Sequence, residues 1–311
     1  MRILLTGASS FSGFWFATKL AARGATVVAP LAGGIETGAA RRDARVAKLL
    51  EFAEVTPEAP FGAPGFLDLL DAPYDALCLH GAAVGDFRNP DYDVAAALGA
   101  STRNAGEVFR RFAAAGGRKV VVTGSAFEPG EGGGAEAVSA YGLAKGFAWS
   151  VLARRAAELG LVASKYVIAN PFGPWEEARL CDYLARAWLA GETPELRAPR
   201  YVRDNAPVDL LAHDYAEFVA ACVTADAPMR RAPSWWVESV LAFAERLGRG
   251  LGPHLGTPTP VRSGVQTQFD EPLARVNADP ILPAPGAWDE AAFWRDYARH
   301  LLALHAPNQA R

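Results

Sequence analysis

Short, uninterrupted apolar runs recur through the first half of the chain. They are rich in β-branched residues and comprise "RILLT" (2–6), "ATVVA" (25–29), "DALCL" (75–79), "KVVVT" (119–123) and "SKYVIA" (164–169). Apolar runs without polar alternation are typical of strands that are buried on both faces of a parallel sheet. The pattern therefore predicts a central parallel sheet.

Longer stretches between most of these runs have apolar residues at helical spacing and end at glycine. They are "FWFATKLAARG" (14–24), "DYDVAAALGASTRNAGEVFRRFAAAGG" (91–117) and "AYGLAKGFAWSVLARRAAELG" (140–160). Glycine commonly ends a helix because it adopts the left-handed conformation without strain. Strands that alternate with helices predict an α/β fold, a Rossmann-like doubly wound parallel sheet with helices on both sides.

The alternation of strands and helices stops at about residue 171, where the sequence becomes proline-rich and irregular. Scattered helical segments such as "CDYLARAWLAG" and "SVLAFAERLG" follow, without repeats or a low-complexity linker. We expect a dinucleotide-binding domain over 1–170 and, mainly, a smaller substrate-binding lobe over 171–311, built on the carboxyl edge of the sheet.

Composition and charge narrow the classes of partner. The chain has 50% hydrophobic and 21% charged residues, a formal net charge of −3 and a pI near 6.0. This balance gives no electrostatic footprint for nucleic acid or for an anionic membrane surface, so we expect neither partner. The opening "MRILLTGASS" resembles neither a signal peptide nor a membrane span, which predicts a cytoplasmic protein.

Cysteines and histidines give no sign of a metal centre. Cys78, Cys181 and Cys222 are far apart and lack C-x-x-C spacing, which predicts buried free thiols. Four histidines also lack metal-ligand spacing: His213, His254, His300 and His305. We therefore expect no metal site.

The segment "LLTGASSFSG" (4–13) has the form of a strand that enters a glycine-rich turn and then a helix. Gly7 and Gly13 occupy the first and last positions of G-x-x-G-x-x-G, but Ser10 occupies the middle one. The middle glycine normally lets the backbone approach a diphosphate, so the serine narrows the site. The backbone amides and the helix N-terminus, which bind most of the anion's charge, are unaffected by this change.

A serine, a tyrosine and a lysine form the candidate catalytic set. Ser125 follows a predicted buried strand, and Tyr141 and Lys145 are four residues apart at the start of a helix, hence on one face. A free tyrosine has a pKa of about 10, but a nearby ammonium favours its phenolate and allows proton exchange with a carbinol. The set predicts acid/base chemistry at an alcohol or ketone carbon.

Several motifs together resemble the extended short-chain dehydrogenase/reductase family, the NAD-dependent nucleotide-sugar epimerases and dehydratases. In order along the chain they are "TGASSFSG", "LHGAA" (79–83), "VVVTGSAF", "YGLAK", "NPFGP" (170–174) and "YVRDN" (201–205). The resemblance is strong over 1–175 and weak after about 215. It implies an enzyme that uses NAD or NADP and a nucleotide-sugar substrate.

The resemblance also implies roles for individual residues. Ser125 and Tyr141 would face the reacting sugar carbon, and Lys145 would hold the nicotinamide ribose and tune Tyr141. The cofactor-binding set would be Gly7, Ser9, Ser10, Phe11, Gly13, Arg41, Arg42, the segment from His80 through Gly81 and Ala82 to Ala83, Tyr141 and Lys145. Asn170 and Arg203 would contact the nucleotide-sugar, with Arg203 on its diphosphate, where a guanidinium meets two phosphate oxygens at once. Arg275 is a candidate second diphosphate arginine by position.

Some residues depart from the family pattern. Leu31 stands where many members have the acid that binds the adenosine ribose, so the usual NAD signature is missing. Arg41 and Arg42 follow shortly after, either as partners for the 2′-phosphate of NADP or as solvated residues at the start of a surface helix. The run Ser125-Ala126-Phe127 lacks the Thr-Asp-Glu of 4,6-dehydratases, which disfavours dehydration.

A charged segment that contains Glu176, Glu177 and Arg179 predicts an exposed loop, with contact to sugar hydroxyls as the alternative. A homodimer is also expected, because the helix of Tyr141 and the long preceding stretch have more apolar surface than one sheet face needs. In the family two such helices from each subunit form the dimer contact.

Three functions remain open at this stage. The favoured one is an epimerase in which a hydride leaves one sugar carbon and returns to it, with Tyr141 as acid/base. The second is an NADPH-dependent reductase of a 4-keto sugar, and the third is a cofactor-sensing regulator without catalysis. The Ser–Tyr–Lys set argues against the regulator, since a sensor needs no proton donor, although fold alone excludes none of them.

Overall fold

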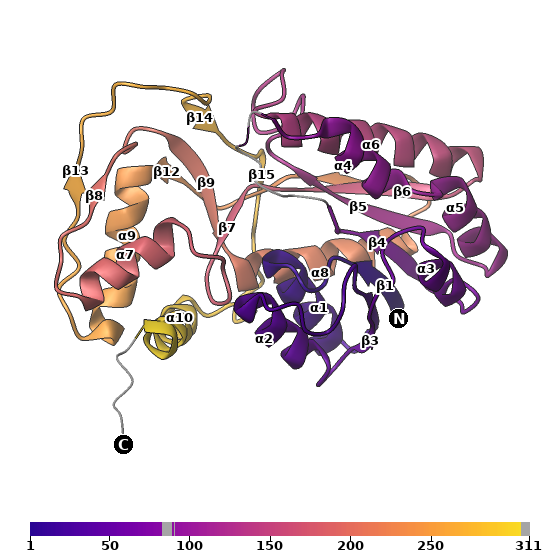
Figure 1. Cartoon of the computed structure of the whole chain (residues 1–311), viewed down its shortest axis with the longest axis horizontal. Coiled ribbons are helices and arrows are strands. Elements are labelled where there is room, and N and C mark those ends of the chain that lie inside the picture. The colour runs from indigo at the N-terminus through magenta and orange to yellow at the C-terminus, as the bar shows by residue number, and fades with distance from the viewer. Residues whose placement is uncertain (83–88, 90, 306–311) are drawn as a thin grey trace.

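A seven-stranded parallel sheet forms the centre of the computed structural model, which describes residues 1–82, 89 and 91–305 (Figure 1). Its strands lie in the order β10-β6-β5-β4-β1-β2-β3, and all of its pairings are parallel. Their bounds are β1 (Arg2–Thr6), β2 (Thr26–Pro30), β3 (Glu54–Thr56), β4 (Ala76–Leu79), β5 (Lys119–Ser125), β6 (Val162–Ile168) and β10 (Arg230–Arg231). The five apolar runs are all strands, and the predicted Rossmann-like α/β fold is confirmed.

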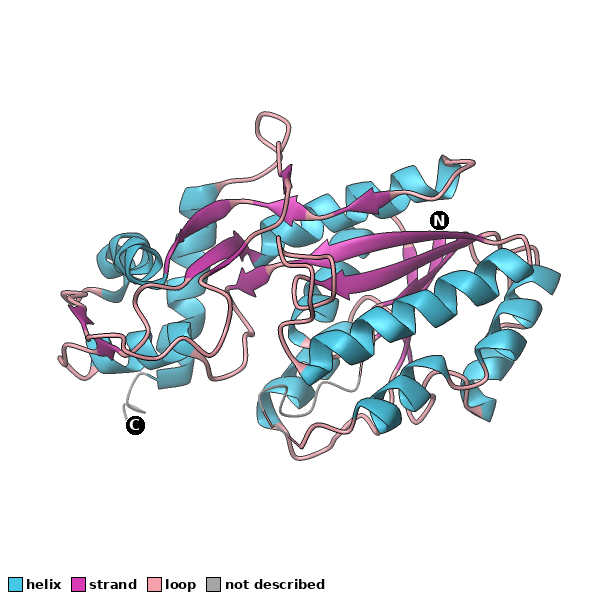
Figure 2. Cartoon of the chain, turned by 90° about the horizontal axis from the view of Figure 1, so that it is seen from above, coloured by secondary structure: helices cyan, strands magenta, loops and turns pink. Residues whose placement is uncertain are grey.

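Helices cover both faces of this sheet (Figure 2). One face carries α1 (Phe11–Ala22), α2 (Ala40–Leu49) and α8 (Val208–Thr224), and the other carries α3 (Pro64–Leu69), α5 (Ala105–Ala114) and α6 (Ala140–Glu158). Successive residues of a strand point to opposite faces, so Ile3 and Leu5 join the first core whereas Leu4 joins the second. The uninterrupted apolar runs therefore supply two cores at once.

The stretch 91–117, which the sequence pattern presents as one helical segment, forms two helices. These are α4 (Val94–Thr102) and α5, and Asn104 between them has a left-handed backbone with φ of 50°. The side chain of Asn104 donates to the carbonyl of Gly62 at 2.8 Å. Asparagine tolerates this conformation better than most residues, so the chain turns here and α4 packs on α6 instead of on the sheet.

The second half of the chain builds a smaller lobe at the carboxyl edge of the sheet. Its main sheet consists of β7 (Asn170–Phe172), β9 (Val202–Pro207), β12 (Trp236–Ser239) and β14 (Ala274–Arg275). Two short pairs add β8 (Glu195–Leu196) with β13 (Arg262–Ser263) and β11 (Pro233–Ser234) with β15 (Asp279–Pro280). The helices are α7 (Leu180–Leu189), α9 (Val240–Leu255) and α10 (Glu290–His305), and they enclose a core around Phe172 and Trp188.

Two elements of the second half return to the large sheet. Strand β10 pairs with β6, and α8 packs beside α1, where the rings of Phe16 and Tyr215 stack with centroids 3.9 Å apart. The division at 170/171 remains a prediction, and these two elements from its second part complete the half that is built on the large sheet. Among the described residues, every helix is too short or too polar to cross a membrane.

Candidate active site

The glycine-rich turn joins β1 to α1 at the centre of the sheet. Gly7 has φ of 71°, and a side chain there would place its Cβ 2.7 Å from the Cα of Gly81 at the end of β4. A Cβ on Gly13 would lie 2.1 Å from the carbonyl oxygen of Gly7. Both positions therefore require glycine for close packing of strand, turn and helix.

Ser10 at the middle position is accommodated because its backbone is extended, with φ of −73° and ψ of 167°. Its hydroxyl caps α1 by accepting a hydrogen bond from the amide of Gly13 at 3.1 Å, and it also lies 3.1 Å from Nε2 of His80. The serine thus uses one first-turn amide, while Phe11 and Ser12 supply two more at the same helix end. A helix N-terminus of this kind is a suitable anion site.

His80 and Gly81 lie directly beside this turn. Both of their amides donate to the hydroxyl of Thr6 at 3.0 Å. Burial, with the charge of Lys145, lowers the pKa of His80 to about 3, so its imidazole is neutral. Ala82 follows them in the described part of the chain, and Ala83 lies outside the described residues.

The residues after β2 behave differently from one another. Leu31 is buried in the protein. Arg42 donates to the carbonyls of Gly34 and Ile35, each at 2.6 Å, in the loop that follows β2. Arg41 instead forms an ion pair with Asp182 in the smaller lobe. A role for either arginine at a cofactor remains a prediction.

The three candidate catalytic residues come from two adjacent elements. Ser125 ends β5, and Tyr141 and Lys145 lie in the first two turns of α6. The ammonium of Lys145 donates to the carbonyl of Thr123, two residues before Ser125. The ring of Tyr141 lies 6.2 Å from that of Phe127, two residues after Ser125. The predicted set therefore converges at the carboxyl end of β5.

Two glycines that the sequence analysis did not single out make this convergence possible. A Cβ on Gly142 would lie 2.0 Å from the carbonyl oxygen of Phe127, and a Cβ on Gly146 would lie 2.8 Å from Pro129. They alternate with Tyr141 and Lys145 in "YGLAKG". The glycines let α6 press against the segment after β5 and bring its tyrosine and lysine to Ser125.

Burial dominates the acid/base properties of the pair. It raises the pKa of Tyr141, as does the carboxylate of Glu128, whereas the guanidinium of Arg179 lowers it. Burial lowers the pKa of Lys145, and Glu128 opposes that effect. The phenol of Tyr141 is therefore protonated at neutral pH, in the form that donates a proton.

Arg203 and Arg275 face each other on neighbouring strands, where β9 and β14 pair them in register. Both are buried, and both donate to the same carboxylate oxygen of Glu271 at 2.9 Å. The guanidinium of Arg275 also lies 3.8 Å from the centre of the Phe127 ring. Since that ring adjoins Tyr141, the two predicted diphosphate arginines lie on the same side of the site as the predicted acid/base residue.

Asn170 begins β7 between the two lobes. Its side-chain amide donates to the side-chain oxygen of Asn205 on β9 at 2.6 Å. Its predicted contact with the nucleotide-sugar remains a prediction.

A buried cluster of charges behind Ser125 was also missed by sequence reasoning. Lys165 on β6 lies 2.7 Å from Glu128 and 2.9 Å from Glu131, and all three side chains are buried. Arg230 on β10 pairs with Glu131 as well. The sequence signals were a lysine within an apolar run, "SKYVIA", and two glutamates in "GSAFEPGEG".

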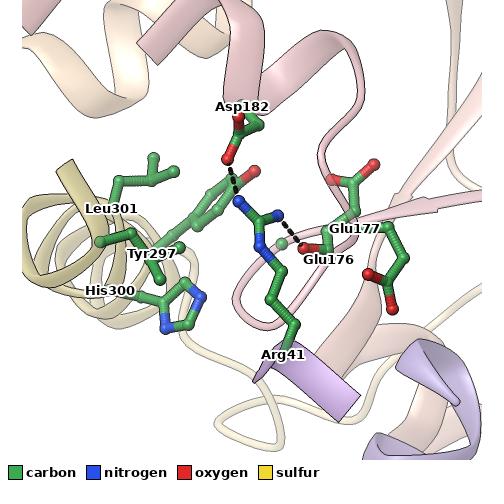
Figure 3. Close-up of a pocket in the computed structure, with 9 residues that line it drawn as sticks. Arg41, Glu176, Glu177, Asp182, Tyr297, His300 and Leu301 are labelled. Atoms are coloured by element: carbon green, nitrogen blue, oxygen red, sulfur yellow. Dashed lines mark hydrogen bonds and ion pairs between the residues drawn. The ribbon is translucent and has the colours of Figure 1, made fainter. Parts of the chain in front are cut away.

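Charged residues also hold the junction of the two lobes (Figure 3). Arg45 is only 2% exposed and donates to the carbonyls of Ser9 and Trp175 at 2.9 and 2.7 Å and to Glu177 at 2.6 Å. It thereby ties the glycine-rich turn to the 173–177 loop. Arg41, about one turn earlier in the same helix, donates to the carbonyl of Glu176.

The charged loop is thus only partly exposed, as its two glutamates show. Glu177 is exposed, but Glu176 lines a cavity of about 10 Å³ with Arg41, Asp182 and His300. This is space for about one water molecule. Burial raises the pKa of Glu176 to about 7. At this loop Trp175 has φ of 72° and donates its amide to His300 at 3.0 Å.

All three cysteines are buried free thiols. Within 1–82, 89 and 91–305, no group of three or more His, Cys, Asp or Glu side chains is arranged to hold a metal ion.

Comparison with known proteins gives matches at the level of structure. No protein-family model and no curated protein sequence matches the chain. A UDP-N-acetylglucosamine 4-epimerase from Methanobrevibacter ruminantium, in complex with UDP-N-acetylmuramic acid, is similar with a TM-score of 0.74 and 15% identity, over 97% of this chain and 98% of that one.

Two further solved structures have the same architecture. A UDP-glucose 4-epimerase from Stenotrophomonas maltophila, with NAD and a formylated UDP-arabinopyranose, has a TM-score of 0.73 and 18% identity over 98% of both chains. A UDP-glucuronic acid 4-epimerase from Bacillus cereus, with UDP-glucuronic acid and NAD, has a TM-score of 0.70 and 15% identity over 98% of this chain and 100% of that one. The resemblance inferred from the motifs is confirmed at the level of the fold, which this chain shares over nearly its whole length with NAD-dependent UDP-sugar 4-epimerases.

Proposed function

We propose that the protein is an NAD(P)-dependent nucleotide-sugar epimerase that acts by transient hydride transfer at one sugar carbon. The observation that carries this proposal is the convergence of Ser125, Tyr141 and Lys145 at the carboxyl end of β5. Ligands of doubly wound folds bind at this edge, where the strand order reverses. In this sheet the reversal falls between β1 and β4, beside Gly7 and Gly81.

Tyr141 is the proposed acid/base. As a phenolate it removes the proton of a sugar hydroxyl, and as a phenol it returns that proton to the keto oxygen. The ammonium of Lys145 favours the phenolate when the proton leaves, because opposite charges stabilise each other in a buried site. The hydroxyl of Ser125 holds the reacting oxygen toward Tyr141.

The residues around the glycine-rich turn fit a dinucleotide. The first-turn amides of Phe11 and Ser12 are suited to a diphosphate, and the glycines at 7, 13 and 81 keep the backbone close to it. Bound NAD or NADP would accept the hydride from the sugar and give it back. Arg42, in the loop after β2, is the candidate for contact with the adenosine ribose or a 2′-phosphate.

Substrate recognition is assigned to the smaller lobe. Arg203 and Arg275 place two guanidinium groups opposite each other on neighbouring strands, a donor arrangement that suits the oxygens of a diphosphate. Asn170 would contact the sugar side of the ligand. The ligands named in the similar solved structures favour a UDP-sugar.

The test is to supply UDP-glucose, UDP-N-acetylglucosamine and UDP-glucuronic acid without added cofactor and to measure the 4-epimers by chromatography. The purified protein should carry NAD(H) or NADP(H) in a substantial fraction of molecules, measured as nucleotide released on denaturation. An empty protein that converts none of these three sugars but reduces a supplied UDP-4-keto-sugar, with NADPH consumed in proportion to product, would replace this proposal with a nucleotide 4-keto-sugar reductase.

We also propose a homodimer formed by α4 and α6. Phe147 and Val151 on α6 are 46% and 38% exposed, and the small residues Ala95 and Ala96 on the adjacent α4 are exposed too. An exposed apolar face along two packed helices is typical of an interface between subunits. Sedimentation at micromolar concentration should show a dimer, and Phe147→Glu should shift it toward the 33.0 kDa monomer. A wild-type protein that sediments only as the monomer would contradict this assembly.

A further inference from the structure

The buried charges behind Ser125 directly contact the backbone of this predicted catalytic residue. Glu128 is fully buried, with 0% of its surface exposed. One of its oxygens accepts a hydrogen bond from the amide of Ser125 at 2.7 Å, and the other lies 2.7 Å from the ammonium of Lys165. The same carboxylate therefore contacts the backbone of a predicted catalytic residue and a buried cation.

The local backbone is shaped to admit this pair. A Cβ on Gly124 would lie 2.7 Å from Cε of Lys165 and 3.0 Å from the Glu128 carboxylate, so the glycine leaves the space that they fill. The amide of Glu128 donates to the carbonyl of Ser125 at 3.0 Å, and the amide of Phe127 lies 3.3 Å from the Ser125 hydroxyl as a donor. Ser125 is thus held on both its backbone and its side chain by the turn that ends at Glu128.

The charges that face the site come from several elements. Glu128 and Tyr92 raise the pKa of Tyr141, and Arg179 lowers it. Glu128 raises the pKa of Lys145, Lys165 lowers it, and Lys145 in turn lowers the pKa of His80. Glu131 faces Lys165 and Arg230 instead. Two carboxylates therefore pair with Lys165, and only one of the two is directed at Ser125.

We propose that Glu128 is a positioning residue for the reaction: it fixes Ser125 and provides the negative charge that balances Lys165 and Lys145 beside Tyr141. The inference rests on the proposed function. If Glu128 loses its charge, its raising effect on the pKa values of Tyr141 and Lys145 disappears, while Lys165 still lowers the pKa of Lys145. The pKa values of Lys145 and Tyr141 therefore both fall, and the pH range in which the enzyme is active moves to lower pH.

The experiment compares Glu128→Gln with the matched variant Glu131→Gln. Each variant removes one charge that faces Lys165, keeps the side-chain shape and retains every catalytic residue. Epimerisation of UDP-glucose, UDP-N-acetylglucosamine and UDP-glucuronic acid is measured from pH 5 to 10, together with the melting temperature. We expect Glu128→Gln to lower kcat at least about 10-fold with KM little changed. It should also move the acid limb of the kcat profile down by about one pH unit.

Glu131→Gln should keep the position of both limbs, while the two variants lose similar amounts of thermal stability. Equal kcat profiles for the two variants, or a loss of kcat in Glu128→Gln without any shift of a limb, would overturn the inference and leave the proposed function intact. A wild-type protein that converts none of the three sugars overturns both together. If Glu128→Gln fails to fold, Glu128→Asp, which keeps the charge at a shorter reach, should lower kcat without moving the limbs, and moved limbs would contradict the proposal.

Discussion

Two clusters of partly or fully buried charge adjoin the proposed active site, and they differ in what their partners are. Behind β5, Glu128 and Lys165 bind each other beside Ser125 and Tyr141, within the half that is built on the seven-stranded sheet. At the junction, Arg45 and Arg41 bind the carbonyls of a loop and the side chains of the smaller lobe. The first cluster surrounds groups that would touch the substrate, and the second holds two parts of the molecule together.

This difference predicts which measured property changes when a charge is removed from each cluster. A change in the first cluster alters the protonation and the position of reacting groups, so its effect falls on rate and on the pH profile. A change in the second leaves carbonyls and carboxylates without partners, so its effect falls on stability and on ligand affinity. The predictions below separate these outcomes.

Tyr141→Phe should give the largest effect. The variant removes the transferable proton and should lower kcat by about 10²–10⁴ while the fold and the affinity for the cofactor stay nearly intact. The measurement is single-turnover conversion of the preferred UDP-sugar, with the melting temperature and bound nucleotide as controls. Wild-type turnover in Tyr141→Phe would remove the tyrosine from the mechanism.

Arg45→Ala should show the opposite behaviour. The buried side chain donates to the carbonyls of Ser9 and Trp175 and to the exposed Glu177, and its loss leaves the two carbonyls without this donor. We expect the free energy of unfolding to fall by about 2–4 kcal/mol, measured by urea denaturation. The kcat of the protein that remains folded should stay within a few-fold of wild type. A stable variant with a low kcat would show that the junction acts on the chemistry directly.

Arg275→Ala tests the second predicted diphosphate arginine, which lies in the smaller lobe. Loss of a charged partner for the diphosphate should weaken the binding of UDP by about 10- to 100-fold, measured by calorimetry, with a smaller change in kcat. The matched control is Arg200→Ala, an exposed arginine of the same lobe that stacks on Phe269. If both variants bind UDP equally well, Arg275 has no part in recognition.

Sequence patterns predicted the half that is built on the seven-stranded sheet well because its strands are buried on both faces. A run such as 119–123 can bury all of its apolar side chains only as a strand that is covered on both faces. The glycine-rich turn marks the start of α1. The pattern missed the break at Asn104, since that break depends on a distant contact with Gly62. Local periodicity contains no information about such a contact.

The residues predicted for the site differ in how the fold brings them together. Ser125, Tyr141 and Lys145 converge because one strand and the next helix are adjacent in both sequence and space. Arg203 and Arg275 are 72 residues apart, and only the pairing of β9 with β14 brings them together. Asp182, the partner of Arg41, and Lys165, the partner of Glu128, are 141 and 37 residues away along the chain, so no motif indicated them. Long-range ion pairs of this kind need the tertiary structure.

Glu176→Gln should give the smallest change, and the pH dependence of its free energy of unfolding distinguishes the two charge clusters. Burial raises the pKa of this carboxyl from 4.5 to about 7, and one of its oxygens is buried without a hydrogen-bond partner among the described residues. The folded state therefore keeps a proton that the unfolded state has released between these two values. The contribution of this proton to the free energy of unfolding is fully present below about pH 4.5 and is lost as the pH rises to about 7. Above that pH, Glu176 causes little further change in the free energy of unfolding.

Glutamine stays neutral at every pH, so the free-energy difference between Glu176→Gln and wild type should grow from about pH 5 to about pH 8. The shift sets an upper limit of about 3 kcal/mol, and we expect about 1–2 kcal/mol because the residue is partly exposed. Urea denaturation across this range measures the difference, with the exposed Glu192→Gln as a control that should show no such slope. Because Glu176 lies at the junction, the kcat profile of Glu176→Gln should keep its limbs where Glu128→Gln moves them. A shifted limb in Glu176→Gln would mean that the two charge clusters act as one.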